Sequence, residues 1–142
     1  MQTEVAHFGI SVVNLDEAVN WYEDNFGASE IKRTYKEALG LSIAVLELGN
    51  LHLELLQPDR PEQTTSIKGT LEKLLQRVGA GHIALSVSDV KGLYNRLKAS
   101  GAEMVTELVE GRYFFCRDPN GVLIEVKQKT KAVLICSERD SN

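Results

Sequence analysis

The feature that most constrains this chain is an internal duplication. The segment from His7 reads HFGISVVNLDEAVNWYEDNFGA and the segment from His82 reads HIALSVSDVKGLYNRLKASGA, so their first residues match at an offset of 75. The segments that close the two halves, GNLHLELL and NGVLIEV, place Glu54 and Glu125 at equivalent positions, at an offset of 71. Each half therefore begins with a histidine and ends with a glutamate, and one fold must accommodate both copies.

Each half carries the same series of secondary-structure signals. Side chains alternate in character over residues 5–13 and 82–87, which predicts a strand at the start of each half. Asn14 and Asp89 are typical helix N-caps, an amphipathic stripe follows each of them, and Gly27 and Gly101 end the stripes. Three extended runs come next, at 30–35, 41–48 and 51–57 in the first half and at 103–108, 112–117 and 122–127 in the second. The prediction for each half is βαβββ.

The predicted fold class is α+β, with two βαβββ modules whose curved mixed sheets enclose a cavity. We expect one domain with a first module over 1–57, a linker with a helix over 58–80, a second module over 81–128 and a C-terminal tail over 129–142. The linker helix is expected between Ser66 and Val78, on the outside of the domain. The apolar run 132–136 fits either an added strand, an inter-subunit contact or a frayed tail.

Composition excludes several classes of partner. Sixteen Lys and Arg against twenty Asp and Glu give a net charge of −4, with no basic cluster, which argues against nucleic acid and anionic membrane surfaces. No apolar run approaches the ~20 residues of a spanning helix, and the N-terminus lacks a signal-peptide pattern. Cys116 and Cys136 lack the spacing of metal ligands, so we expect reduced thiols in a cytoplasmic protein, with Cys116 in the core or a pocket wall.

In the strands that carry the repeated histidines and glutamates, alternate side chains point to opposite faces. One face is aliphatic, and the other carries the histidines and glutamates. His7 and His82 share a face with small residues, and Glu54 and Glu125 also lie opposite their aliphatic neighbours. If the modules pair, these four side chains point into one cavity. Two imidazoles and two carboxylates suit a divalent metal such as Zn, Ni, Co, Mn or Fe(II), and the cation offsets the cost of burying two carboxylates.

Other interpretations of these residues are simpler. A single histidine in a strand is more often a hydrogen-bonded structural residue than a ligand, and the recurrence of both residue types is what favours a metal site. His52 lies on the same face as Glu54 and is either an alternative ligand or a residue that contacts substrate. Trp21 and Tyr22 are expected to pack in the core.

At these residues the chain resembles the vicinal oxygen chelate superfamily. That superfamily includes lactoylglutathione lyase (glyoxalase I), methylmalonyl-CoA epimerase, fosfomycin resistance enzymes, bleomycin-binding proteins and extradiol dioxygenases. The resemblance covers about residues 4–128, through HFGISVVNLDEAVNWYEDNFG, LHLELLQP, GHIALSVSDV and DPNGVLIEV. It implies a glyoxalase-like fold with His7, Glu54, His82 and Glu125 as metal ligands.

The resemblance also implies a chemistry. A small carbonyl or thioester substrate chelates the metal and reacts through an enolate, with Glu125 as the base and Glu54 as a second acid or base. The motifs divide between subfamilies: GHIALSV and DPNGVLIEV are similar to glyoxalase I, whereas LGNLHLELLQP and the linker are similar to the epimerase. The epimerase's second catalytic glutamate aligns with Ile43, its HPK-type segment is replaced by CRDPNG, and the glyoxalase Gly-rich loop is reduced to VEGR.

We therefore predict a metal-dependent lyase or isomerase that forms a homodimer. The alternatives are a thiol transferase or Fe(II) dioxygenase, or a non-catalytic protein that binds an antibiotic or metabolite. Four ligands argue against the dioxygenase, which keeps a coordination position open, and against the binding proteins, which lack the ligands. The modules pair either within one chain or between two chains.

Overall fold

A computed structural model describes residues 1–65 and 67–130 of the chain. The elements of the first half are β1 (Phe8–Ser11), α1 (Leu15–Phe26), β2 (Ser29–Lys36), the 3-10 helix η1 (Glu37–Leu39), β3 (Leu41–Leu48) and β4 (Leu51–Pro58). The linker helix α2 (Leu71–Leu75) leads to β5 (Ile83–Val87), α3 (Val90–Ala99), β6 (Tyr113–Arg117) and β7 (Leu123–Gln128). The predicted α+β class is confirmed. No helix in the described ranges is long and apolar enough to span a bilayer.

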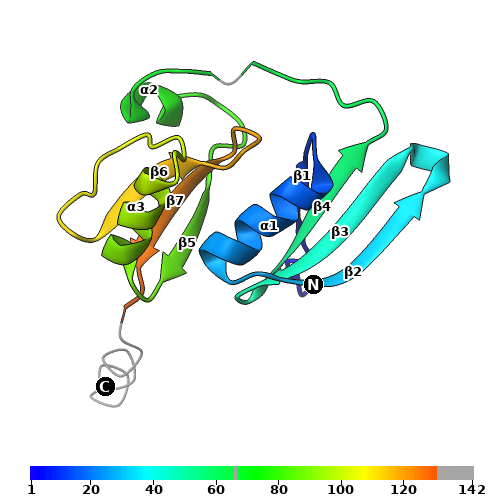
Figure 1. Cartoon of the computed structure of the whole chain (residues 1–142), viewed down its shortest axis with the longest axis horizontal. Helices are drawn as coiled ribbons and strands as arrows, with labels where there is room; N and C mark the ends of the chain where they lie inside the picture. The colour runs from blue at the N-terminus through cyan, green and yellow to red at the C-terminus, as the bar shows by residue number, and fades with distance from the viewer. Residues whose placement is uncertain (66, 131–142) are drawn as a thin grey trace, which may run out of the picture.

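Each half forms its own mixed sheet (Figure 1). The first sheet has the strand order β1-β4-β3-β2 and the second has the order β5-β7-β6. In both sheets the first strand of the half runs parallel to the last strand, and the other neighbours are antiparallel. The registers are equivalent, because Gly9 pairs with Glu54 in the first sheet and Ala84 pairs with Glu125 in the second.

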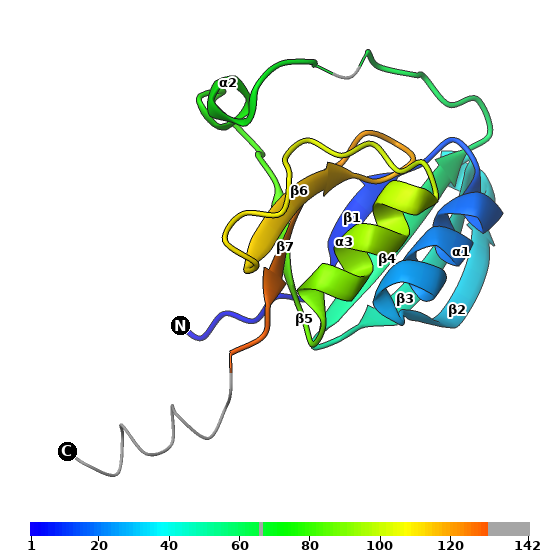
Figure 2. The same ribbon diagram turned by 60° about the vertical axis from the view of Figure 1, so that its left-hand side comes forward.

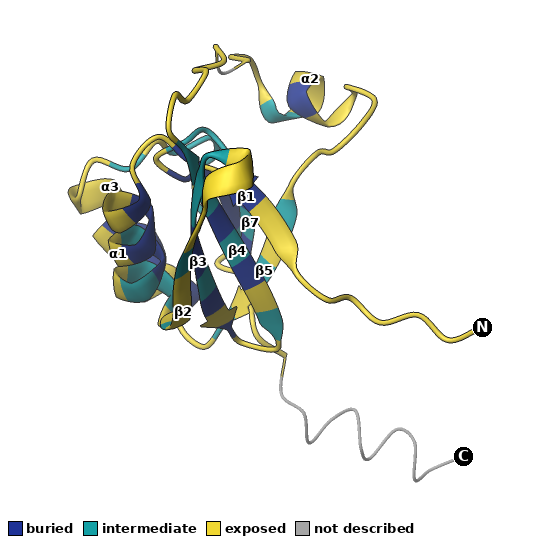
Figure 3. Cartoon of the chain, turned by 90° about the vertical axis from the view of Figure 1, so that its right-hand side faces the viewer, coloured by how far each residue is buried: buried dark blue, intermediate teal, exposed yellow. Residues whose placement is uncertain are grey.

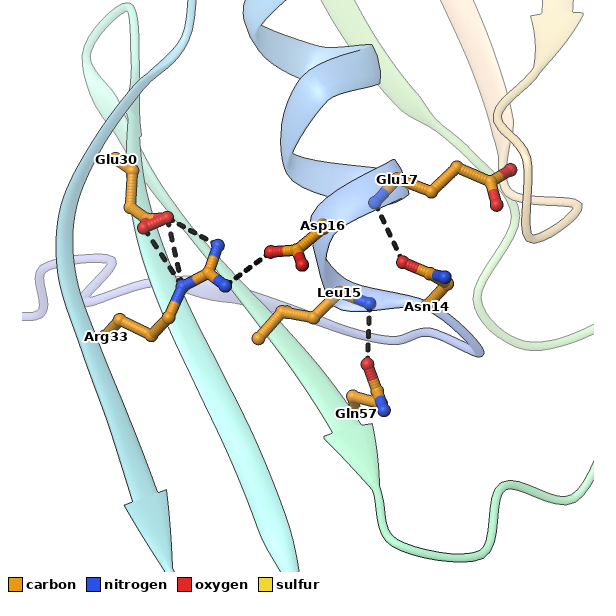
Figure 4. Close-up of polar contacts among 7 residues, drawn as sticks. All are labelled: Asn14, Leu15, Asp16, Glu17, Glu30, Arg33 and Gln57. Atoms are coloured by element: carbon orange, nitrogen blue, oxygen red, sulfur yellow. Dashed lines mark hydrogen bonds and ion pairs between the residues drawn. The ribbon is translucent and has the colours of Figure 1, made fainter.

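The start of α1 is fixed by two side chains that accept hydrogen bonds from its first backbone N–H groups (Figure 4). Asn14 is the N-cap, as predicted, and its Oδ1 accepts from the N–H of Glu17 at 2.9 Å. Gln57, at the end of β4, reaches across and accepts from the N–H of Leu15 at 2.7 Å. Arg33 of β2 adds ion pairs to Asp16 and Glu30 beside this helix end. The helix is thereby tied to two strands of its sheet.

The start of α3 repeats this arrangement. Asp89 is the N-cap and accepts from the N–H of Gly92 at 3.0 Å, while Gln128 at the end of β7 accepts from the N–H of Val90 at 3.1 Å. Gln57 and Gln128 are therefore equivalent residues of the two halves. Each one satisfies a backbone donor that a helix terminus otherwise leaves without an intrahelical partner.

The aliphatic faces of the sheets and the apolar sides of α1 and α3 form one shared core. Alternation along the strands is as predicted, since Leu53, Leu55, Ile124 and Val126 are fully buried. Figure 2 shows α1 and α3 side by side, and Arg96 of α3 donates to two carbonyl oxygens near the end of α1. The two halves thus contact each other through their helix-covered sides. Of β1, Ile10 is buried in this core, and the other three residues are exposed (Figure 3).

A buried polar contact also joins the halves. The Tyr22 hydroxyl on α1 donates to Asp118 Oδ2 at 2.7 Å, and both residues are almost fully buried. Asp118 Oδ1 accepts from the N–H groups of Asn120 and Val122, which fixes the turn between β6 and β7. The Asn120 side chain in turn accepts from the N–H of Val13 at 3.0 Å. Tyr22 was predicted to pack in the core, which it does, but its hydrogen bond was not predicted.

The strand predicted at 103–108 does not form, so the second half has three strands where four were expected. The segment runs beside β6, with an isolated bridge between Met104 and Cys116. The N–H groups of Val105 and Thr106 both donate to the carbonyl oxygen of Phe115, and the Thr106 hydroxyl accepts from the Phe115 N–H. These bonds replace the regular ladder, because two residues face one on the neighbouring strand.

The linker helix is shorter than predicted. Of the stripe expected between residues 66 and 78, only α2 is helical, and Leu74 is its buried residue. Leu74 packs on Phe115 and Leu123 of the second sheet. The buried Arg117 side chain donates to the carbonyl oxygen of Ile67 at 2.7 Å, which holds the linker against the same sheet. The predicted run 132–136 lies outside the described residues.

Candidate metal centre

The first candidate pair is formed by His7 and Glu54. Glu54 lies on β4 directly across from Gly9 of β1, and His7 precedes Gly9 by two positions. Residues two apart project from the same face of an extended chain, so His7 and Glu54 lie on one face. The His7 Nε2 and Glu54 Oε2 atoms are 3.5 Å apart, with side chains 50% and 22% exposed. An imidazole and a carboxylate are thus adjacent and accessible.

The second candidate pair, His82 and Glu125, occupies the same register positions, but no ion pair joins these two residues as one joins His7 to Glu54. Glu125 of β7 lies across from Ala84 of β5, and His82 precedes Ala84 by two positions. Glu125 is half-buried and His82 is exposed. The imidazole ring of His82 contacts the ring of Phe115 edge-to-face, with centroids 5.3 Å apart. The duplication therefore extends from sequence to strand register.

The four predicted ligands do not converge within one chain. Among residues 1–65 and 67–130, no group of three or more His, Cys, Asp or Glu side chains gathers as a metal site would require. The structure brings His7 to Glu54, and it leaves this pair separate from His82 and Glu125. One chain therefore presents two candidate half-sites. The first half-site is His7 with Glu54, and the second half-site is His82 with Glu125.

The donor geometry of the first half-site suits a metal. Atoms that share one transition-metal ion at bond lengths of ~2.0–2.2 Å lie about 3–4 Å from each other. The separation of 3.5 Å between His7 Nε2 and Glu54 Oε2 falls in that range. Nitrogen and carboxylate oxygen donors are also the set that Zn, Ni, Co, Mn and Fe(II) accept.

The residues around Glu54 define the rest of this face. On β3, Val45 lies across from Glu54, so Ile43 and Glu47 share the same face by alternation. Ile43 is 6% exposed, whereas Glu47 is exposed and lies across from His52. His52 is exposed on the same face as Glu54, as predicted, but it forms no ion pair with any residue of 1–65 or 67–130. Glu47 is therefore a second ionisable carboxylate on the face of the first half-site.

The buried polar residues of the chain lie elsewhere. Burial raises the pKa of the Cys116 thiol to about 12, which leaves it protonated at neutral pH and unsuited to nucleophilic chemistry. Burial also raises the pKa of Asp118, and the hydrogen bond from Tyr22 opposes that rise. Cys116 belongs to the shared core, as one of the two predictions for it stated. The Tyr22–Asp118 hydrogen bond joins the two halves, and Cys116 packs in the core that they share.

The fold and the repeated register define a class of duplicated α+β proteins with a histidine and a glutamate at the same positions in each sheet. The family model of the Glyoxalase/Bleomycin resistance protein/Dioxygenase superfamily matches residues 4–126. The chain belongs to this superfamily, and the predicted resemblance is confirmed.

Similar proteins of known activity are distributed over several reactions. The chain is 30% identical to the metallothiol transferase FosB of Shouchella clausii, over 93% of this chain and 84% of the relative. It is 29% identical to the mitochondrial methylmalonyl-CoA epimerase of Homo sapiens, over 86% of this chain and 72% of the relative.

Solved structures support the fold. The glyoxalase I of Leishmania major superposes with a TM-score of 0.73 at 24% identity, covering 98% of this chain and 95% of that one. A variant of the fosfomycin resistance protein FosX of Listeria monocytogenes superposes with a TM-score of 0.68 at 21% identity, covering 95% and 99%, and that protein was complexed with Mn(II).

Proposed function

We propose that this chain is a cytoplasmic metal-dependent enzyme of the lyase or isomerase kind, similar in chemistry to glyoxalase I or methylmalonyl-CoA epimerase. Its metal ligands are His7, Glu54, His82 and Glu125. The observation that carries the proposal is the repeated register, in which a histidine lies two positions before the residue that faces a glutamate. An exposed structural histidine has no reason to recur with its glutamate at the same place in both sheets.

We place each metal centre between two copies of the chain. The two half-sites stay apart within one chain, so one pair from each copy is needed to complete four ligands. Within the described residues, β1 and β5 each lie at the end of their sheet and keep one free edge next to the ligand histidines. Free edges are where a sheet accepts another strand. A homodimer with two-fold symmetry contains two such centres.

A divalent metal held by the four residues would supply Lewis-acid stabilisation of the charge that forms on a substrate oxygen when the adjacent carbon loses its proton. The chain itself supplies the proton transfer. Glu125 accepts the proton, so the C–H bond breaks as a carboxyl O–H bond forms. A carboxyl group on the other half-site then returns a proton, which isomerises the substrate if it arrives at another atom and epimerises it if it arrives on the other face of the same carbon.

Two residues are available for the second role. Glu54 is next to His7, and Glu47 lies on the same face without being a proposed ligand. Ile43 occupies the position at which the resemblance implies a glutamate, and it cannot transfer a proton. Glu54 or Glu47 therefore takes that part if the reaction is an epimerisation. The substrate is a small carbonyl compound or thioester with two neighbouring oxygens.

Proton transfer to carbon can be followed directly by deuterium incorporation. The protein is purified without chelator and incubated in heavy water with methylmalonyl-CoA or with the methylglyoxal–glutathione adduct. Deuterium incorporated by the wild type, and lost in Glu125→Gln, supports the proposal. Stoichiometric metal without exchange into either substrate contradicts enolate chemistry on these two.

Thiol transfer is the second candidate, because the FosB relative is 30% identical over nearly the whole chain. It predicts consumption of a thiol in the presence of fosfomycin and metal, with no deuterium exchange into the carbonyl substrates. A non-catalytic binding protein would consume nothing and release its ligand unchanged.

A further inference from the structure

The two half-sites hold their histidines differently. His7 lies against the carboxylate of Glu54, 3.5 Å away. His82 lies against an aromatic ring, with the Phe115 centroid 5.3 Å away and the two planes at 67°. An edge-to-face contact of this kind has a preferred geometry and restricts ring rotation. The second histidine therefore has an aromatic neighbour, whereas the neighbour of the first is a carboxylate.

Phe115 is itself held rigidly. It lies on β6 directly across from Glu125 of β7, and its ring also contacts the His82 ring, so it neighbours both predicted ligands of the second half-site. It is 3% exposed, and it packs in a cluster with Leu74 of the linker helix and Leu123 of β7. A ring enclosed in this way cannot follow a moving imidazole, so the imidazole must adopt the orientation that the ring permits.

The linker helix α2 covers the cluster that contains Phe115. Leu74 is the buried residue of α2 and covers Phe115 and Leu123. The Arg117 guanidinium donates to the carbonyl oxygens of Ile67 and Gly121, each at 2.7 Å, which fixes the linker on the second sheet. Among the described residues, a buried cluster of this kind lies on the ligand-bearing face of the second sheet and not on that of the first. The duplication alone therefore does not account for it.

We propose that Phe115 is a positioning residue that orients the His82 imidazole for metal binding, with α2 holding Phe115 in place. The proposal rests on His82 being a metal ligand, as in the proposed function. Metal coordination requires the ring nitrogen to point at the ion, and neighbours that fix a ligating imidazole raise metal affinity. An aromatic edge-to-face pair contributes enough free energy to change an equilibrium constant about 2- to 10-fold.

The test is the metal dissociation constant of the full-length protein, measured by competition between Zn²⁺ binding and a chromophoric chelator. Phe115→Leu keeps an apolar side chain in the cluster but removes the ring, and we expect its Zn²⁺ dissociation constant to rise about 2- to 10-fold. Phe115→Tyr retains the ring and should bind Zn²⁺ as the wild type does. Leu97→Ala creates a cavity in the shared core, outside the Phe115 cluster, so it should lower the melting temperature and leave the dissociation constant unchanged.

Separate outcomes distinguish failure of the inference from failure of the proposed function. If His82→Ala binds Zn²⁺ as tightly as the wild type, the ligand assignment fails and the inference fails with it. If His82→Ala loses Zn²⁺ but Phe115→Leu binds as the wild type does, the positioning role alone is wrong. An equal loss of affinity in Leu97→Ala and Phe115→Leu also contradicts it, since general destabilisation of the second half would then explain both.

Discussion

Replacing Tyr22 with phenylalanine should destabilise the junction between the two halves. The substitution removes one hydroxyl, 2.7 Å from Asp118 Oδ2, and leaves the aromatic ring in the core. Tyr22 is 1% and Asp118 is 5% exposed, so water cannot replace the lost donor. A buried hydrogen bond to a charged group contributes about 1.5–3 kcal/mol. For a chain of this size, this corresponds to a fall of about 4–10 °C in melting temperature.

The loss should depend on pH, and its sign follows from Asp118. Burial raises the pKa of this carboxyl above 3.8, so the native state keeps its proton to higher pH than the unfolded state does. Asp118 therefore contributes stability that is present near pH 4 and is lost as pH rises through its native pKa. The Tyr22 hydrogen bond limits that rise in pKa, and Tyr22→Phe removes this limit. The melting-temperature difference between variant and wild type should be larger at pH 8 than at pH 4.

Tyr94→Phe is the matched control for this experiment. It removes the equivalent atom from a buried tyrosine on α3, but its partner, Glu107, has a side chain that is 84% exposed. Water can hydrate Glu107 after the change, so the melting temperature should hardly move. Thermal unfolding followed by circular dichroism at both pH values measures all three proteins. A Tyr22→Phe loss no greater than that of Tyr94→Phe, or one independent of pH, would refute the reasoning.

Three further predictions concern the helix starts, the thiol and the half-sites. Gln57→Ala and Gln128→Ala each remove an acceptor from the first N–H of a helix, and each should lower the free energy of unfolding by about 1 kcal/mol, measured by urea titration. Cys116 is buried with its pKa raised to about 12, so iodoacetamide at pH 8 should modify it in urea but not in the native protein; rapid native labelling would show that it is accessible. His7→Ala and Glu125→Gln should abolish turnover while the far-ultraviolet circular dichroism spectrum stays that of the wild type; an unfolded spectrum would instead mark these residues as structural.

Local sequence signals predicted most of the fold because they describe local physics. The side chain of Asn14 caps the start of helix α1, and the helix ends at Gly27, whose backbone is left-handed. The run 103–108 shows where local signals fail. Its residues do lie beside β6, as their β propensity predicts, but the Thr106 hydroxyl accepts the hydrogen bond from the Phe115 N–H that a backbone carbonyl accepts in a regular β-ladder. The linker helix was overestimated for a related reason. Its apolar stripe is longer than the surface that Phe115 and Leu123 offer, and Leu75 and Val78 remain exposed.

The candidate site could be predicted only in halves. Alternation within a strand places His7 and Glu54 on one face, and the structure bears this out with a contact of 3.5 Å. Alternation says nothing about how two sheets are placed relative to each other. That placement depends on which surfaces α1 and α3 bury, and here they join the halves through the core, away from the ligand-bearing faces. The Tyr22–Asp118 contact was missed for the same reason, because its partners are 96 residues apart.

The most direct test of a metal centre shared between two chains is metal analysis of mixed dimers. His7→Ala and His82→Ala proteins, each without metal when purified alone, are unfolded together, refolded and loaded with Zn²⁺. Random pairing makes about half of the dimers mixed, and each mixed dimer has one centre with all four ligands, so about a quarter of the wild-type metal content should return. No recovery in the mixture would contradict the shared centre, and wild-type metal in either variant alone would contradict the ligands themselves.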